Sequence, residues 1–435
     1  MYRDISSLIL YSSMPGDEIL ASIGRIYRDW SLGSVSKAEL THRIFEQVKR
    51  ILDLSTAYGF DRNLWQNYLT FLMISHENSF SLTCERASAS HGSIESIALH
   101  DFEIFRRLMH FDFAPLEEDL GISCFSLLCN YHAIAKREQL FNRLVSEKVC
   151  ALSKKLDKAV DAKKIYALVT RHFEDFGVGL FGLNRAFRVL ESAPHLQFQE
   201  INNLDQVMLD DLIGYDQQKT ALRMNIEAFL AGKPFNNTLL YGDAGTGKST
   251  SVKALANEYY QQGLRIVEIN KYQFHLLSQV ISMVKTRNYK FILFMDDLSF
   301  EENEGEYKFL KAVIEGGLEN RPDNVMLLAT SNRRHLIREN WNDRSDMEHE
   351  MDMHRSDTMQ EKLSLAARFG CSIAYYAPNH KQYQDIVRGI AARSSLALSD
   401  AELMALANQY ELSHGGTSGR TAQQFINMLL GSQLS

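Results

Sequence analysis

Residues 238–257 read TLLYGDAGTGKSTSVKALAN, and within them 242–249 fill every position of the phosphate-binding pattern G-x-x-x-x-G-K-[ST]. The glycines allow positive φ angles and let backbone N–H groups point at phosphates with no Cβ in the way. A short apolar strand precedes the loop, and a helix is predicted from Lys248 to about Gln262, ended by Gly263. The positive end of that helix would face the anion, so we interpret the stretch as a nucleotide site and not as a simple glycine turn.

The residue types in this loop match the parts of a bound nucleotide. Lys248 would bring a mobile charge to the β- and γ-phosphates, and the hydroxyl of Ser249 would ligate Mg²⁺. The loop residues predicted to bind the nucleotide are Gly242, Asp243, Ala244, Gly245, Thr246, Gly247, Lys248, Ser249 and Thr250.

Polar residues also follow two later apolar strands. Phe291–Met295 runs straight into Asp296 and Asp297. Asp296 would hold the metal and its water shell, and Asp297 would orient or deprotonate the attacking water, although a helix cap is the ordinary alternative for a paired acid. Val325–Thr330 leads to Asn332, which could hold the same water or sense the γ-phosphate but is, taken alone, a common turn residue.

Length and composition limit the possible classes of protein. With 435 residues, 45% hydrophobic and 23% charged, the chain is expected to form two or three soluble globular domains. Its formal net charge of −7 argues mildly against a dedicated nucleic-acid coat. The five scattered cysteines indicate free thiols in a reducing compartment. We find no signal peptide and no apolar run of about 18 residues, so we expect a cytoplasmic location and no membrane contact.

The pattern along the chain predicts an α/β P-loop NTPase with a parallel sheet and a small C-terminal helical lid, preceded by an all-α N-terminal domain. The expected segments are a helical domain of unknown function at 1–195, a linker at 196–207, the α/β domain at 208–378 and the lid at 379–435. The predicted strands are Thr238–Tyr241, Leu264–Ile269, Lys290–Met295, Val325–Thr330 and Ser372–Tyr376, and the predicted lid helices are Lys381–Ala392, Asp400–Tyr410 and Gly419–Leu430.

Two further patterns look functional but have ordinary explanations. Residues 177–182, GVGLFG, match the dinucleotide pattern G-x-G-x-x-G. They follow a helical-looking segment and not a strand, which favours a glycine-rich turn packed on aromatic side chains. In 349–354, HEMDMH, the histidines lie five residues apart, about 140° around a helix, so they could not share one metal ion, and we expect a solvated acidic loop.

Together these motifs resemble those of the AAA+ ATPases over roughly residues 205–435. The resemblance implies that Asn332 is the sensor 1 residue, that Arg368 in the stretch LAARF is an arginine finger, and that Arg420 is the sensor 2 arginine of the lid. It also implies that the stretch LIG, ending in Ile213 and Gly214, brackets the adenine.

More specifically, the chain resembles a bacterial AAA+ family known as domain of unknown function 815, over most of its length. The matching stretches are 63–85, 176–188, 296–301 (DDLSFE), 316–324 (GGLENRPDN), 330–336 (TSNRRHL), 361–365 (EKLSL) and 418–421 (SGRT). The resemblance implies binding and hydrolysis of ATP with Mg²⁺ but implies no substrate. Most AAA+ proteins carry Glu at the position of Asp297, whose side chain is one methylene shorter, which predicts slow hydrolysis or a shared role for Glu301 or Glu302.

The expected function is ATP hydrolysis that remodels a protein partner docked on the helical N-terminal domain. If Arg368 reaches the γ-phosphate of a neighbouring subunit, the protein is a homo-oligomer. The alternative is a nucleic-acid-linked ATPase of the initiator or helicase-loader type, favoured by Arg333, Arg334 and His335 after sensor 1. A P-loop kinase is a third class, which would need an acceptor site and no lid arginine.

Overall fold

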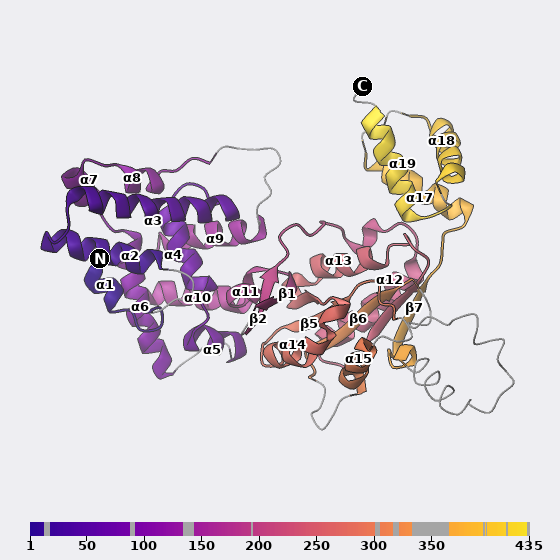
Figure 1. Cartoon of the computed structure of the whole chain (residues 1–435), viewed down its shortest axis with the longest axis horizontal. Helices are drawn as coiled ribbons and strands as arrows, with labels where there is room; N and C mark the ends of the chain where they lie inside the picture. The colour runs from indigo at the N-terminus through magenta and orange to yellow at the C-terminus, as the bar shows by residue number, and fades with distance from the viewer. Residues whose placement is uncertain are drawn as a thin grey trace. The chain divides into compact units, whose positions relative to one another are not determined.

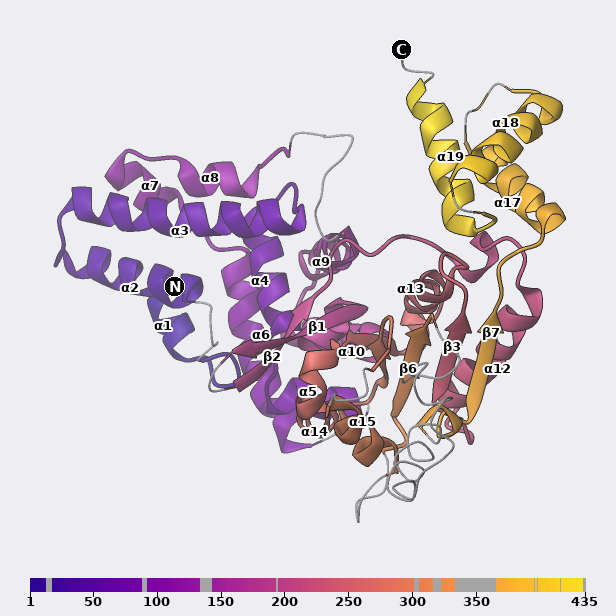
Figure 2. The same ribbon diagram turned by 45° about the vertical axis from the view of Figure 1, so that its right-hand side comes forward.

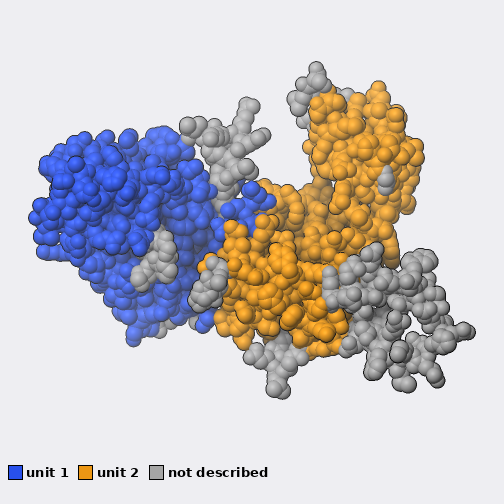
Figure 3. Space-filling view, viewed as in Figure 1, with its two compact units in different colours: residues 1–184, 200–203 blue, residues 185–199, 204–435 orange. Residues whose placement is uncertain are grey.

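The structure is a computed structural model of the 435-residue chain. It describes residues 1–12, 18–87, 92–133, 143–192, 195–300, 305–315, 322–332, 365–394, 396, 398–414 and 416–432. Contacts within the chain divide it into two compact units (Figure 3). Unit 1 comprises Met1–Asn184 and Glu200–Asn203, and unit 2 comprises Arg185–Gln199 and Leu204–Ser435.

Unit 1 is built from helices around one hydrophobic core (Figure 1). Helix α4 is buried along most of its length, including Trp65 and Tyr68, because it is apolar on almost every side. Local capping sets helix starts: Asn63 accepts the N–H of Gln66 at the start of α4. The helices are α1 Tyr2–Ser6, α2 Ile19–Leu32, α3 Lys37–Tyr58, α4 Leu64–Ser75, α5 Ser79–Ala87, α6 Ser93–Met109, α7 Ala114–Leu120, α8 Cys124–Cys129, α9 Arg143–Leu156, α10 Ala162–Phe176 and α11 Gly179–Leu183.

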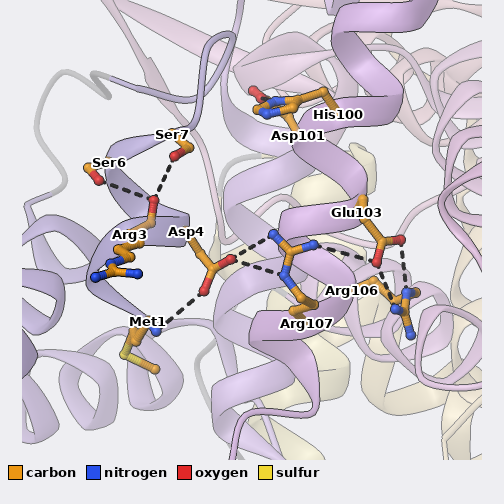
Figure 4. Close-up of polar contacts among 10 residues, drawn as sticks. All are labelled: Met1, Arg3, Asp4, Ser6, Ser7, His100, Asp101, Glu103, Arg106 and Arg107. Atoms are coloured by element: carbon orange, nitrogen blue, oxygen red, sulfur yellow. Dashed lines mark hydrogen bonds and ion pairs between the residues drawn. The ribbon is translucent and has the colours of Figure 1, made fainter.

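The start of the chain is held against α6 by two carboxylates (Figure 4). The fully buried Asp101 accepts the backbone N–H groups of Ile9, Leu10 and Tyr11, at 2.7 to 3.3 Å. Nearer the surface, Asp4 accepts two hydrogen bonds from the guanidinium of Arg107, at 3.0 and 2.6 Å. The N-terminal segment is therefore fixed mainly through its backbone.

Unit 2 contains a seven-stranded sheet in the order β2-β1-β4-β5-β6-β3-β7. All strand pairs from β1 to β7 are parallel. Figure 2 shows β6, β3 and β7 side by side. Its central strands are continuous apolar runs because both faces of such a sheet are covered. The strands are β1 Ala186–Ser192, β2 His195–Glu200, β3 Thr238–Gly242, β4 Leu264–Glu268, β5 Lys290–Met295, β6 Val325–Ser331 and β7 Cys371–Tyr375.

Helices and 3₁₀ turns connect these strands in sequence order. One face of the sheet packs on α12 and α13 through Leu222, Phe229 and Leu255, which are buried. The connecting elements are η1 Leu209–Asp211, α12 Asp216–Leu230, α13 Lys248–Glu258, η2 Tyr260–Gln262, η3 Lys271–Leu276, α14 Leu277–Val284 and α15 Glu306–Glu315. The five strands predicted from the sequence all form, within one or two residues of the expected bounds.

The region expected to be the end of the helical domain and a linker differs from the prediction. β1 and β2 occupy 186–192 and 195–200, and β1 pairs with β4, so these residues extend the sheet. The contact boundary accordingly falls at Arg185, ahead of the expected end of the helical domain at 195. The prediction missed β1 because its pairing with β4, about 80 residues away, leaves no local pattern in the sequence. It also missed β2, which joins the sheet only through β1.

The lid consists of α17 His380–Ala392, α18 Asp400–Ser413 and α19 Gly419–Ser432, as predicted to within a few residues. A separate hydrophobic cluster, which includes Tyr383, Met404 and Phe425, joins the three helices. The first two helices begin with reciprocal capping boxes, and the box of Ser399 and Glu402 at α18 was expected from the sequence.

The glycine-rich stretch 177–182 ends α10 and begins the short helix α11, and no strand precedes it. The buried ammonium of Lys148 donates to the carbonyl oxygen of Gly182 at 2.9 Å and lies over the ring of Phe176. This stretch is therefore a packed turn beside an aromatic ring, as predicted. The expected loop at 349–354 lies outside the described residues. In the part of the chain that the structure describes, no helix is long and apolar enough to cross a membrane.

Candidate functional site

The phosphate loop joins β3 to α13, and its glycines are required by conformation and by space. Gly242, Gly245 and Gly247 have φ angles of 129°, 76° and 94°, which L-residues with side chains rarely adopt. A Cβ on Gly242 would lie 2.1 Å from the carbonyl oxygen of Tyr375, and one on Gly247 would lie 2.9 Å from Leu212. The loop therefore packs directly against β7 on one side and against Leu212 on the other.

Lys248 is the first residue of α13 and is 6% exposed. Its Nζ donates to the carbonyl oxygens of Gly242 and Asp243, at 2.8 and 2.7 Å, and to Oδ1 of Asn332 at 3.0 Å. Burial lowers the pKa of Lys248, and the neighbouring carboxylates of Asp243, Asp297 and Asp296 oppose that shift. The ammonium thus lies inside the loop and links it to the tip of β6.

Asp296 follows β5 and faces the start of α13. One carboxylate oxygen, Oδ1, accepts the hydroxyl of Ser249 at 2.6 Å and the hydroxyl of Thr330 at 2.5 Å. Among the described residues none hydrogen-bonds to the other oxygen, Oδ2.

A hydroxyl and a carboxylate are the hard oxygen donors that suit Mg²⁺, so Ser249 and Asp296 fit this ion. Within the described ranges, no three His, Cys, Asp or Glu side chains converge on a common point. Mg²⁺ in proteins usually takes further ligands from phosphate and water.

Asp297 has a φ of 51°, in the left-handed region where Asp is one of the better tolerated residues. Its N–H donates to the Thr330 hydroxyl at 2.9 Å, and its Oδ1 accepts the side-chain amide of Asn332 at 2.7 Å. Because Asn332 also accepts from Lys248, the structure brings together the predicted lysine, acid and amide in one hydrogen-bonded chain.

The two residues implied to bracket the adenine line a cavity of about 750 Å³. Ile213 and Gly214 form part of its wall, with Tyr215 at the start of α12, and Pro378 and Ile386 on the lid side. The prediction did not include the last three. Ile213 also packs against the core of the lid. The cavity is large enough to hold a small ligand.

The other predicted loop residues take structural positions. Thr246 is buried and its hydroxyl donates to the carbonyl oxygen of Asp243 at 2.8 Å. Ala244 is exposed on the outer turn, and Thr250 is half-buried in the first turn of α13. The carboxylate of Asp243 accepts the backbone N–H of Ala377 at 2.7 Å, at the rim of the cavity.

Arg420 is the second residue of α19 and lies close to the phosphate loop. Its backbone N–H donates to the carbonyl oxygen of Gly245 at 3.2 Å. Its guanidinium is exposed, and its charge acts to lower the pKa of Lys248. The predicted sensor 2 arginine is thus beside the predicted phosphate site.

Arg368 does not lie at the phosphate loop of its own chain. It precedes β7, whose first residue Cys371 pairs with Thr238 at the start of β3, whereas Gly242 pairs with Tyr375 at the far end. A strand of this length spans about 13 Å, at roughly 3.3 Å per residue. Arg368 forms an ion pair with Glu315 at the end of α15.

Sequence reasoning missed Thr330, the residue that contacts both Asp296 and Asp297. The sequence did contain a signal for Thr330, because it is a polar residue at the end of the apolar run that forms β6. Several candidates lie outside the described residues, namely Glu301, Glu302, Arg333, Arg334 and His335.

A parallel sheet with a phosphate loop after β3, paired acids after β5, an amide after β6 and a three-helix lid defines a P-loop ATPase fold of the AAA+ class. The chain belongs to the family described as "Protein of unknown function (DUF815)", whose model matches residues 183–433, more than half of the chain.

Two curated relatives match a short part of the chain. The replication factor C large subunit of Staphylothermus marinus is 39% identical over 85 residues, which is 19% of either chain. The replication factor C large subunit of Methanococcus vannielii is 33% identical over 78 residues, 18% of this chain and 16% of that protein. The chain thus spans less than a fifth of the length of these relatives.

Solved structures of RuvB from Thermotoga maritima are also similar. A mutant form of that protein is 18% identical with a TM-score of 0.35, covering 49% of this chain and 62% of that one. Another structure of this RuvB, a Holliday junction branch migration motor, is 15% identical with a TM-score of 0.32, covering 51% of this chain and 72% of that one.

Proposed function

We propose that this protein is a Mg²⁺-dependent ATPase that hydrolyses ATP to ADP and phosphate. The observation that carries the proposal is the connected set of Lys248, Asn332 and Asp297 beside the Ser249–Asp296 pair, all at one edge of the sheet. Phosphoryl transfer asks a protein chiefly for positioning and charge, which such a set supplies.

Each residue then has a role in the reaction. The N–H groups of the loop and the ammonium of Lys248 would hold the β- and γ-phosphates. Ser249 and Asp296 would hold Mg²⁺, which when bound neutralises charge on the phosphate oxygens. Asp297 and Asn332 would orient the attacking water.

The lid has a part in the same proposal. Ile213 and Gly214 would contact the base in the 750 Å³ cavity, because both line its wall. Arg420 would sense the γ-phosphate from the first turn of α19, next to Gly245. Loss of that phosphate would then change the position of the lid.

Alanine variants of two lysines on α13 test this proposal. Lys248→Ala should lose MgATP binding by at least tenfold and abolish phosphate release, because the ammonium contacts the phosphates directly. Lys253→Ala is the matched control, since Lys253 lies on the outside of α13 in a surface pair with Asp205. Normal turnover in Lys248→Ala, or no MgATP binding by the wild-type protein at millimolar nucleotide, would refute the proposal.

We further propose that hydrolysis remodels a protein client docked on unit 1. The support is that unit 1 forms a helical body with its own core, separate from the nucleotide-binding unit. Asp297→Asn should bind MgATP and hydrolyse it slowly, so it should retain a client that wild-type protein releases on adding ATP. Mass spectrometry of proteins retained by Asp297→Asn and not by Lys248→Ala identifies that client.

A nucleic-acid-linked ATPase is the second candidate, and the turn between α9 and α10 favours it. Residues 154–164, KKLDKAVDAKK, carry five lysines and two aspartates, a local charge of +3 in a chain of −7. All five lysines are exposed, and none pairs with an acid among the described residues. Lysine is depleted at protein interfaces but well suited to phosphodiesters, so this lysine turn fits a nucleic-acid backbone.

Binding of a fluorescent DNA or RNA duplex tests the second candidate. The variant Lys154→Glu, Lys155→Glu, Lys158→Glu should lose affinity at least tenfold, and wild-type affinity should fall steeply with salt. The control is Lys308→Glu and Lys311→Glu, which changes charge on α15 instead. If both variants bind the duplex equally well, or if the affinity for the duplex does not change with salt, the protein-client proposal is the better supported of the two.

A further inference from the structure

The outer turn of the phosphate loop is held by the segment that leads into the lid and by the first turn of α19. On one side, the carboxylate of Asp243 accepts the N–H of Ala377 at 2.7 Å. On the other side, the carbonyl oxygen of Gly245 accepts the N–H of Arg420 at 3.2 Å. Only Ala244 separates these two points in the loop, so the loop and the lid share a short contact region.

The first of these contacts uses a side chain and can be changed without altering the backbone. The main chain of Asp243 is already occupied, because its N–H donates to Tyr375 and its carbonyl oxygen accepts from Lys248 and Thr246. Its carboxylate bonds instead to Ala377, which lines the cavity beside the lid. That side chain is therefore in a position to link the loop to the lid.

Ala377 belongs to residues 376–379, the lid connector, between β7 and α17. The connector is joined to the lid at its far end, where the side chain of Asn379 caps α17 by accepting the N–H of Gln382 at 2.9 Å. It is also joined to the start of α19, because the hydroxyl of Thr417 donates to the carbonyl oxygen of Pro378 at 2.6 Å. The connector is therefore bonded both to α17 and to the segment that begins α19.

We infer that Asp243 is a positioning residue that couples the phosphate loop to the lid through the lid connector. When phosphates fill the loop, the bond to Ala377 transmits the position of the loop to α17 and α19, and so to Arg420. The inference rests on the proposed ATP hydrolysis and adds the residue through which the nucleotide site controls the lid. The Asp243 carboxylate then bonds to the connector, whereas the loop pattern predicts that Asp243 binds the nucleotide.

Hydrogen exchange on the full-length protein tests the bond directly, without any need for activity. Asp243→Ala should speed amide exchange in the lid connector by about fivefold or more, because the N–H of Ala377 loses its acceptor. Asp243→Asn keeps a carbonyl oxygen at the same place and should stay within about twofold of wild type. The matched control is Asp205→Ala, which removes an exposed carboxylate paired with Lys253 on α13.

Turnover provides the second readout. Asp243→Ala should lower kcat for MgATP about fivefold with KM changed less than about twofold, and Asp243→Asn should restore most of kcat. Adding MgATP to wild type should alter exchange in α17 and α19. This response should be clearly smaller in Asp243→Ala, where only the bond between Gly245 and Arg420 still joins the loop to the lid. A purely structural role would lower the stability of Asp243→Ala without this division between kcat and KM.

Three results would contradict the coupling or the proposed function. Unchanged connector exchange and kcat in Asp243→Ala, with wild type binding and hydrolysing MgATP, would overturn the coupling alone. Equal loss of MgATP binding in Asp243→Ala and Asp243→Asn would also overturn it, because the carboxylate would then act at the phosphates. Wild-type protein that binds no MgATP would refute the proposed function, and the exchange readout on the nucleotide-free protein would still decide the Asp243–Ala377 bond.

Discussion

Thr330 makes both acids of the candidate site depend on one hydroxyl. It is 1% exposed at the end of β6, donates to Asp296 at 2.5 Å and accepts the N–H of Asp297 at 2.9 Å. A hydroxyl has one proton, so donating it to the carboxylate leaves a lone pair for the N–H group. The same side chain thus orients the carboxylate of Asp296 and holds the left-handed backbone of Asp297.

We predict that Thr330→Val lowers kcat for MgATP at least tenfold while KM changes less than about twofold, because valine keeps the shape and loses both bonds. Thr330→Ser keeps the hydroxyl and should restore most of the activity. Phosphate release measured against MgATP concentration separates the two constants. Full kcat in the valine variant would contradict the assigned role.

A buried histidine in unit 1 predicts how stability depends on pH. His172 in α10 is 6% exposed, its Nε2 has no hydrogen-bond partner among the described residues, and burial lowers its pKa to about 3, helped by Lys148 and Lys155. Above a pH of about 6.5 the histidine is neutral in both states. As pH falls below that value the unfolded chain binds a proton that the folded chain refuses, so folding stability falls.

Wild-type protein should therefore lose up to about 1.4 kcal/mol of unfolding free energy per pH unit between pH 6.5 and 5 from this group. His172→Gln should remove this dependence, whereas His132→Gln, at an exposed position, should keep it. Urea unfolding at pH 7.5, 6.5 and 5.5 measures the slopes. Identical slopes for wild type and His172→Gln would contradict the prediction.

At the scale of elements, the first residues of the chain depend on α6 (Figure 4). Asp101 accepts backbone N–H groups from three successive residues, Ile9 to Tyr11, in a fully buried position. Charge-assisted bonds of this kind are strong, and removing the acceptor leaves buried donors unsatisfied.

Asp101→Ala should destabilise unit 1 by about 2–4 kcal/mol and raise amide exchange at residues 9–11. Asp4→Ala, which removes a more exposed carboxylate from the same segment, should cost less than about 1 kcal/mol. Chemical denaturation and hydrogen exchange on both variants provide the comparison. Similar losses in the two would mean that the backbone contacts do not hold the segment.

At the scale of the whole molecule, the position of Arg368 bears on whether several copies of the chain assemble. It lies at the edge of the sheet opposite the phosphate loop of its own chain, so an arginine finger at this position would have to act on a neighbour. Its ion pair with Glu315 would then have to be exchanged for one with phosphate.

Mixing two inactive variants tests action between subunits. Arg368→Ala keeps an intact phosphate loop and Lys248→Ala keeps an intact Arg368, so together they should recover part of the wild-type phosphate release that neither has alone. Wild-type activity should also rise faster than linearly with protein concentration. If activity stays strictly proportional to protein concentration down to nanomolar protein, and mixing the variants recovers no phosphate release, Arg368 does not act on a neighbouring subunit.

The sequence by itself determined the features that are local in the chain. The phosphate loop needs glycines and Lys248 within eight residues, so its pattern is readable directly. The acids and Asn332 follow strands that are continuous apolar runs, and parallel strands end at one edge, which brings Lys248, Asp297 and Asn332 together. Capping at Ser399 is equally local.

Only the tertiary structure decided the features that depend on distant pairings. β1 joins the sheet by pairing with β4, about 80 residues away, and no nearby residue specifies that partner; β2 then lies beside β1 at the edge of the sheet. Asp243 was readable as a loop residue, but the direction of its carboxylate depends on Ala377, 134 residues away. The roles of Thr330 and Asp101 likewise depend on hydrogen-bond partners far along the chain. A hydrogen bond depends on distance in space and not on separation in sequence.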